Sequence, residues 1–191
     1  MVVIADASAD PAWVASDLLA QAEHDPDAVP ILISLDEALP ARVEEELERQ
    51  LGGLPTAATA RSALNNGGVI VCATEADACT VCDDIAPEHL QVAVANAEAW
   101  PDRLRHYGAL FIGARSAEVF GDYGMGPNHV LPTGGTARAR GGLSVLDFLR
   151  VRTWTRVDSA VDPDLVADVA WFARQEGLEA HARAAEMRRQ D

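Results

Sequence analysis

The stretch LLAQAEH, residues 18–24, combines leucines suited to a core with two side chains that can bind a metal ion. Gln21 and His24 are three residues apart, so on a helix they share one face, where an amide oxygen and an imidazole can converge on one point. A metal ion could occupy that point, but a solvated helix edge explains this pair more simply. Other residues must decide between the two interpretations.

Three further segments carry residues suited to proton transfer or metal binding. Glu88 and His89 are adjacent in APEHLQ. An imidazole titrates near neutral pH, so it and a neighbouring carboxylate can both take part in proton transfer. Successive strand residues point to opposite faces, so a surface glutamate beside a hydrogen-bonded histidine is the alternative. Asp122 lies in a glycine-rich segment, and His181 lies in LEAHARA, where a solvated histidine is the simpler interpretation.

The elements that must position these residues alternate between short apolar runs and amphipathic segments. We expect strands at residues 2–5, 31–35, 69–73, 90–94 and 109–113, and helices at about 11–24, 36–51, 58–66, 75–86 and 96–106. Asp10 is the expected N-cap of the first helix, with Pro11 in its first turn. This β-α alternation predicts an α/β fold with a mostly parallel sheet, helices on both faces, and ligands at the carboxyl ends of the strands.

The pattern changes at Gly121, where a long glycine-rich segment begins that includes Asn128 and His129. A loop of this length inside a compact domain is usually functional or disordered, and its polar residues favour function. After Ser144 we expect a short helix, a strand at 151–157, and helices at about 163–176 and 178–190. We therefore divide the chain into an α/β domain, residues 1–143, and a small, mostly helical unit, residues 144–191.

Composition excludes several classes of protein. The chain of 191 residues has 30 acidic and 15 basic residues, a formal charge of −15, which disfavours nucleic acid as a partner. No apolar run approaches the length of a membrane span, and the first residues lack the basic start of a signal peptide. Cys79 and Cys82 form a single CxxC within an expected helix, which favours buried structural thiols in a reducing cytoplasm over a zinc or redox site.

Four segments together resemble one family in order and spacing. VIADASADPAWVASDLLAQAEH, APEHLQ, GDYGMGPNHVLPTGGTARARGGLSVLDF and EGLEAHA are similar to the carboxyl-terminal half of histidinol dehydrogenase, and the resemblance covers essentially the whole chain. It implies that the α/β domain is an incomplete Rossmann-like sheet. It also implies two successive oxidations of L-histidinol, through the aldehyde to L-histidine, each delivering a hydride to NAD.

The resemblance assigns a role to each candidate residue. The implied zinc ligands are Gln21, His24, Asp122 and His181, all of which would also contact substrate, as would His89, His129 and Glu176. His89 resembles the general base that takes the hydroxyl proton. Glu88 resembles the residue that activates water in the second oxidation. An oxygen and nitrogen ligand set of this kind suits zinc.

The resemblance also implies groups that this chain does not supply. In the family, a Gly-Pro-Ser-Glu stretch with a substrate-contacting serine comes just before the equivalent of Met1, and the NAD-binding domain precedes that stretch. GGTARARGG does not lie between a strand and a helix as a dinucleotide fingerprint must. Glu176 and His181 would come from the partner subunit of an intertwined homodimer, so metal binding would require dimerisation.

Three interpretations remain open from the sequence. The chain is one piece of a complete or split histidinol dehydrogenase, or a truncated, non-catalytic zinc-binding dimer that has lost NAD. The third is a degenerate remnant that does not fold alone, because exposed apolar strand edges favour aggregation.

Overall fold

The computed structural model describes residues 1–125, 128–157 and 159–189, which form two compact units. The first unit is Met1–Phe148 and the second is Leu149–Asp191. This geometric division falls slightly beyond the boundary between residues 143 and 144 that the sequence suggested. The functional roles assigned to the two parts remain predictions.

The first unit is built on a five-stranded parallel sheet. Its strands are β1 (Val2–Ala5), β2 (Ile31–Ser34), β3 (Gly68–Val71), β4 (His89–Ala93) and β5 (Ala109–Ile112), in the order β3-β2-β1-β4-β5. The central strand β1 pairs with β2 and β4, so that Ile4 lies between Ile33 and Val92. All five predicted strands and the predicted parallel α/β architecture are thereby confirmed.

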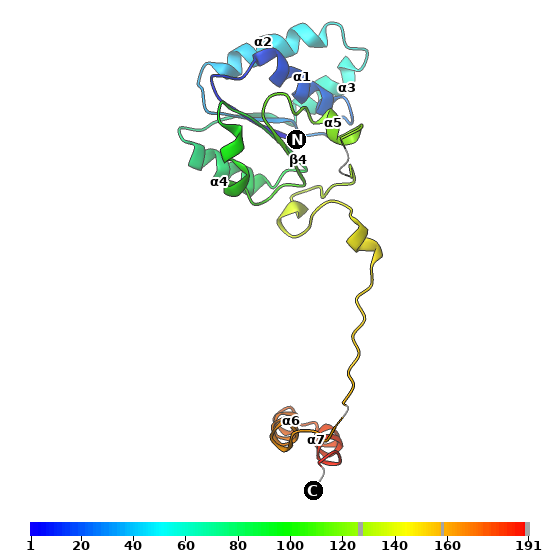
Figure 1. Ribbon diagram of the computed structural model, residues 1–191. Coiled ribbons are helices and arrows are strands. Elements are labelled where there is room, and N and C mark those ends of the chain that lie inside the picture. The colour runs from blue at the N-terminus through cyan, green and yellow to red at the C-terminus, as the bar shows by residue number, and fades with distance from the viewer. Residues whose placement is uncertain (126–127, 158, 190–191) are drawn as a thin grey trace. The chain divides into compact units, whose positions relative to one another are not determined.

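Helices cover both faces of this sheet (Figure 1). They are α1 (Pro11–Ala22), α2 (Leu39–Leu51), α3 (Ala57–Leu64), α4 (Glu75–Ile85) and the single turn α5 (Val119–Asp122). Figure 1 shows α1, α2 and α3 on one side of the sheet and α4 on the other. Asp10 caps α1 as predicted, because its side chain accepts a hydrogen bond from the Ala12 N–H at 2.9 Å.

Two apolar layers follow from the alternation of side chains along the strands. Val2 and Ile4 join Cys82 and Trp100 in one layer. Val3 joins the other, with Leu18 of α1 and Val43 of α2. The central strand β1 therefore contributes side chains to both layers, as expected for a sheet covered by helices on both faces.

The three cysteines are free and buried in the first of these layers. Burial raises the pKa of the Cys82 thiol to about 12, because the surrounding apolar groups disfavour the thiolate. This environment suits structural thiols rather than a redox pair, since a reactive cysteine needs an accessible thiolate.

Two predicted elements are wrong. The helix expected over residues 96–106 is instead a pair of 3₁₀ turns, Ala97–Ala99 and Pro101–Arg103, because Pro101 has no N–H to continue the helical hydrogen bonds. The strand expected at 151–157 is absent from the sheet, and these residues are exposed. Residues of high strand propensity form a strand only where a partner strand satisfies their backbone groups.

The second unit contains α6 (Pro163–Gln175) and α7 (Glu179–Glu186), which pack against each other through Ala170, Ala173 and Ala182. Gly177 makes the turn between them with φ of +76°, a conformation that glycine adopts without strain. The predicted last helix extended to Gln190, which lies outside the described residues, whereas α7 ends at Glu186.

One further expected helix belongs to the first unit: the short helix predicted after Ser144 is the 3₁₀ turn Val145–Phe148. Among the described helices, none has the length and apolar character that crossing a membrane requires.

Candidate metal and catalytic site

Three side chains from two distant segments meet in the first unit. His24, Glu118 and Asp122 each offer one ligand atom, and these atoms all lie within 4.8 Å of one another. His24 Nε2 is 4.0 Å from Asp122 Oδ2. His24 is exposed, Asp122 is partly exposed and Glu118 is buried. An imidazole and two carboxylates at this separation can hold a divalent cation.

Gln21 supplies an independent sign that a ligand belongs here. Its Oε1 atom is buried and has no hydrogen-bond partner within the described residues. A buried carbonyl oxygen without a partner is costly, and a bound cation would satisfy it. Gln21 lies in the last turn of α1, which ends at Ala22, so the expected helix does not reach His24. His24 follows in the turn after the helix, three residues beyond Gln21, and the amide oxygen suits the same ligand set by its chemistry.

The candidate site lies at the edge of the sheet where the strands begin. Helix α1 runs back from the carboxyl end of β1, so its last turn lies at the amino edge. His89 is the first residue of β4 and belongs to the same edge, and Figure 1 shows the N-terminus beside α5. The expectation that a ligand site lies at the carboxyl ends of the strands is therefore wrong for this group.

His89 is held against a second buried group of the site. Its Nε2 atom is 3.4 Å from Oε1 of Glu118, and both side chains are buried. Burial lowers the pKa of His89 to about 4 and raises the pKa of Glu118 to about 7, because a low dielectric disfavours the charged form of each. His89 is therefore a neutral imidazole at pH 7, the form that can accept a proton.

Glu88 is held by the turn between α4 and β4. Burial raises the pKa of its carboxyl group, and the nearby Asp122 carboxylate raises it further. The Glu88 carbonyl accepts a hydrogen bond from the Ala109 N–H at 2.9 Å, at the start of β5. Gly108 passes so close that a Cβ atom there would lie 2.5 Å from that carbonyl oxygen, so only glycine fits.

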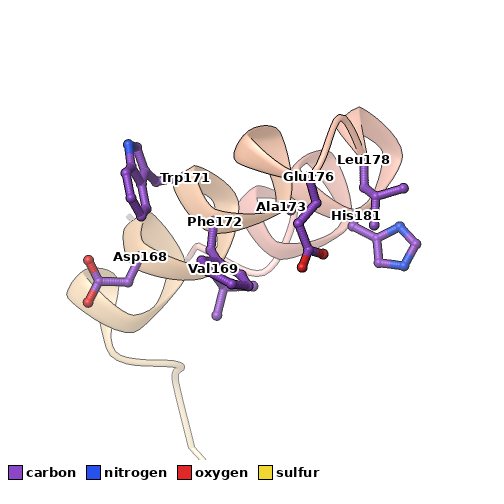
Figure 2. A pocket seen from close by; sticks show the side chains of 8 residues that line it. All are labelled: Asp168, Val169, Trp171, Phe172, Ala173, Glu176, Leu178 and His181. Carbon is purple, nitrogen blue, oxygen red and sulfur yellow. The ribbon is translucent and has the colours of Figure 1, made fainter.

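The remaining predicted site residues lie elsewhere. Glu176 and His181 belong to the second unit, where both line a cavity of about 540 Å³ on the α6–α7 hairpin (Figure 2). The same cavity is lined by the exposed apolar side chains of Val169, Trp171 and Phe172. His129 is exposed in the irregular segment that follows α5. Within the first unit the structure thus brings Gln21, His24 and Asp122 to one region, and within the second it brings Glu176 and His181 together.

The sequence analysis missed Glu118. It lies four residues before Asp122 in EVFGD, and it occupies the N-cap position of α5. The spacing is that of one helical turn, which would have placed both carboxylates on one face. The glycine-rich surroundings concealed this turn, because they indicate a loop.

The fold and the site together define a class: a parallel α/β protein with a candidate metal site beside a buried imidazole–carboxylate pair. Comparison with known proteins makes the assignment specific. The family model described as histidinol dehydrogenase matches residues 1–189, and the chain belongs to that family.

Individual relatives agree with this assignment. Histidinol dehydrogenase of Thermus thermophilus is 46% identical over 188 residues, covering 98% of this chain and 46% of that protein. Histidinol dehydrogenase of Nitratidesulfovibrio vulgaris is 50% identical over 187 residues, covering 97% and 43%. The crystal structure of histidinol dehydrogenase from Elizabethkingia anophelis superposes with a TM-score of 0.91 at 36% identity, covering 98% and 43%. The chain therefore spans less than half the length of these relatives.

Proposed function

We propose that this chain forms part of a zinc- and NAD-dependent histidinol dehydrogenase, which oxidises L-histidinol to L-histidine through histidinal in histidine biosynthesis. The observation that carries the proposal is the meeting of the His24, Glu118 and Asp122 ligand atoms within 4.8 Å in a chain of this family. The neutral, buried His89 at 3.4 Å from Glu118 adds a proton acceptor to the same site.

The metal would be held by Gln21, His24 and Asp122 of the first unit, with His181 as the fourth ligand. The donor set fits zinc, because it consists of two imidazoles, a carboxylate and an amide oxygen that otherwise stays unsatisfied. Bound zinc would orient the amino alcohol of the substrate and polarise its oxygen. Glu176 and His129 would contact the substrate as well.

His89 and Glu88 would move the protons. Each oxidation removes a hydride from carbon and a proton from oxygen, and a water molecule adds to the aldehyde between the two oxidations. His89 is neutral and has an Nδ1 atom without a partner among the described residues, so this atom can take the proton of the substrate hydroxyl. Burial keeps the pKa of Glu88 above its ordinary value, which suits a carboxylate that takes a proton from the attacking water.

NAD is the hydride acceptor that this reaction implies. Gly134 and Gly135 precede a 3₁₀ turn, Thr136–Arg138, rather than joining a strand to a helix, so they do not form a dinucleotide-binding loop. We assign no NAD contact to the described residues.

A homodimer is part of the proposal, with Glu176 and His181 supplied across the interface. The exposed apolar side chains beside them on the α6–α7 hairpin support it, since Trp171 is 62% and Phe172 is 59% exposed. A reducing, cytoplasmic setting also belongs to the proposal, in keeping with three buried free thiols.

The test is NADH formation from L-histidinol by the purified chain with zinc, alone and after mixing with the amino-terminal half of a relative. We expect activity only on mixing. Zinc binding without NADH formation in either sample would contradict the proposal and favour a non-catalytic zinc-binding dimer. A mixture with heat-denatured amino-terminal half controls for contaminating dehydrogenases.

A further inference from the structure

The pairing of His89 with Glu118 has a defined geometry at each nitrogen of the ring. Nε2 lies 3.4 Å from Glu118 Oε1, whereas Nδ1 is buried without a hydrogen-bond partner among the described residues. Glu118 Oε1 is likewise buried and unpaired. The pair is therefore just beyond the usual hydrogen-bond range and has no competing partner at these atoms.

A general base of this kind needs one particular tautomer. A neutral imidazole carries its proton on one nitrogen and a lone pair on the other, and the hydrogen bond made by one nitrogen decides which tautomer is present. A carboxylate on the far nitrogen also stabilises the imidazolium that forms when the base takes a proton. Glu118 faces Nε2, and in its ionised form it can only accept a hydrogen bond, so it would leave the lone pair on Nδ1.

We propose that Glu118 is the positioning residue for His89: it accepts the Nε2–H hydrogen bond and so keeps Nδ1 unprotonated and ready to take a proton. This inference rests on the base role of His89 in the proposed function. Catalytic hydrogen bonds are often long before substrate is bound, and a closure of a few tenths of an ångström brings this pair within range.

The competing role for Glu118 is that of a metal ligand, because its carboxylate also lies within 4.8 Å of the ligand atoms of His24 and Asp122. The two roles differ in what removal of the carboxylate changes. A positioning residue controls the state of the His89 ring and leaves zinc bound, whereas a ligand controls zinc affinity.

The decisive measurement is the imidazole ¹⁵N spectrum of the 191-residue chain, which reports the protonation of each ring nitrogen. The His89 signals are identified by their loss in His89→Asn. We expect wild-type His89 to be a single tautomer protonated on Nε2, and Glu118→Ala to give a mixture of both tautomers. Glu118→Leu is a second test with similar side-chain volume, and Glu98→Ala on the exposed surface is the matched control.

Unchanged His89 ¹⁵N signals in both Glu118 variants would overturn the proposal, and so would a loss of zinc binding equal to that in Asp122→Ala. In the mixture with an amino-terminal half, we expect Glu118→Ala to lower kcat about 10²-fold or more without raising KM for L-histidinol, with partial rescue in Glu118→Gln. If the wild-type mixture forms no NADH, the proposed function fails, while the tautomer measurement still decides the role of Glu118.

Discussion

His24, in the turn that follows α1, and Asp122, the last residue of α5, bring their side chains together, with Nε2 and Oδ2 4.0 Å apart, although most of the sheet separates them in the sequence. We expect His24→Ala and Asp122→Ala each to weaken zinc binding by about 10-fold or more, since even residues that only support a ligand cost this much. Isothermal titration calorimetry measures the affinity. His106→Ala is the matched control, because His106 contacts the Asp83 carbonyl away from this site. Unchanged zinc affinity in both variants would show that His24 and Asp122 are not zinc ligands.

Gln21 is expected to act as a ligand through its amide oxygen. Gln21→Ala should lower zinc content while leaving the free energy of unfolding of the metal-free chain nearly unchanged or slightly higher, because it removes a buried oxygen without a partner. Gln50→Ala is the comparison, since the Gln50 side chain donates a hydrogen bond to the Ala12 carbonyl at 2.9 Å. Elemental analysis after dialysis gives the zinc content, and a wild-type stoichiometry in Gln21→Ala would count against the assignment.

His89→Asn should abolish turnover and leave zinc in place. Asparagine cannot take a proton from an alcohol at neutral pH, so we expect kcat in the reconstituted mixture to fall about 10²–10⁴-fold. Steady-state NADH formation and zinc content are measured on the same sample. Zinc loss in His89→Asn would show that His89 supports the metal rather than the proton transfer.

Gly108→Ala should destabilise the first unit at the position of Glu88. The added Cβ would lie 2.5 Å from the Glu88 carbonyl oxygen and 3.0 Å from Pro132 Cδ, so the backbone beside Glu88 and His89 must shift. We expect the free energy of unfolding to fall by about 1–3 kcal/mol. Gly68→Ala is the control, because a Cβ there meets nothing within 4 Å. Urea denaturation compares the two, and equal stability would show that the backbone accommodates the methyl group.

The Cys82 thiol should be inert in the folded chain. Its pKa is raised to about 12 by burial, so at pH 8 the thiolate fraction is negligible and iodoacetamide should modify Cys82 only after unfolding. The unfolded thiol loses its proton near pH 8.5, whereas the folded one keeps it, so stability should fall as pH rises from about 8.5 towards 12. Mass spectrometry after timed labelling measures the modification. Rapid labelling of Cys82 in the native chain would contradict its burial.

The fold was largely predictable from local patterns. The apolar runs at 2–5 and 31–35, with the capped helix after Asp10 between them, are short-range signals that the sequence carries without reference to the rest of the chain. Prediction failed at 96–106 and 151–157. In the first segment Pro101 interrupts residues that otherwise favour a helix. In the second, residues that favour a strand are not paired with any strand of the described sheet.

The sequence by itself determined which residues could bind a metal or move a proton, because residue type and helical spacing are local properties: Gln21 with His24, and Glu88 with His89. Only the tertiary structure decided that the site lies at the amino edge of the strands and that Glu118 joins it. Those features depend on the direction in which α1 returns and on where the chain turns back after β5. Such contacts between segments far apart in the sequence are set by packing of the whole sheet and its helices, which no local pattern encodes.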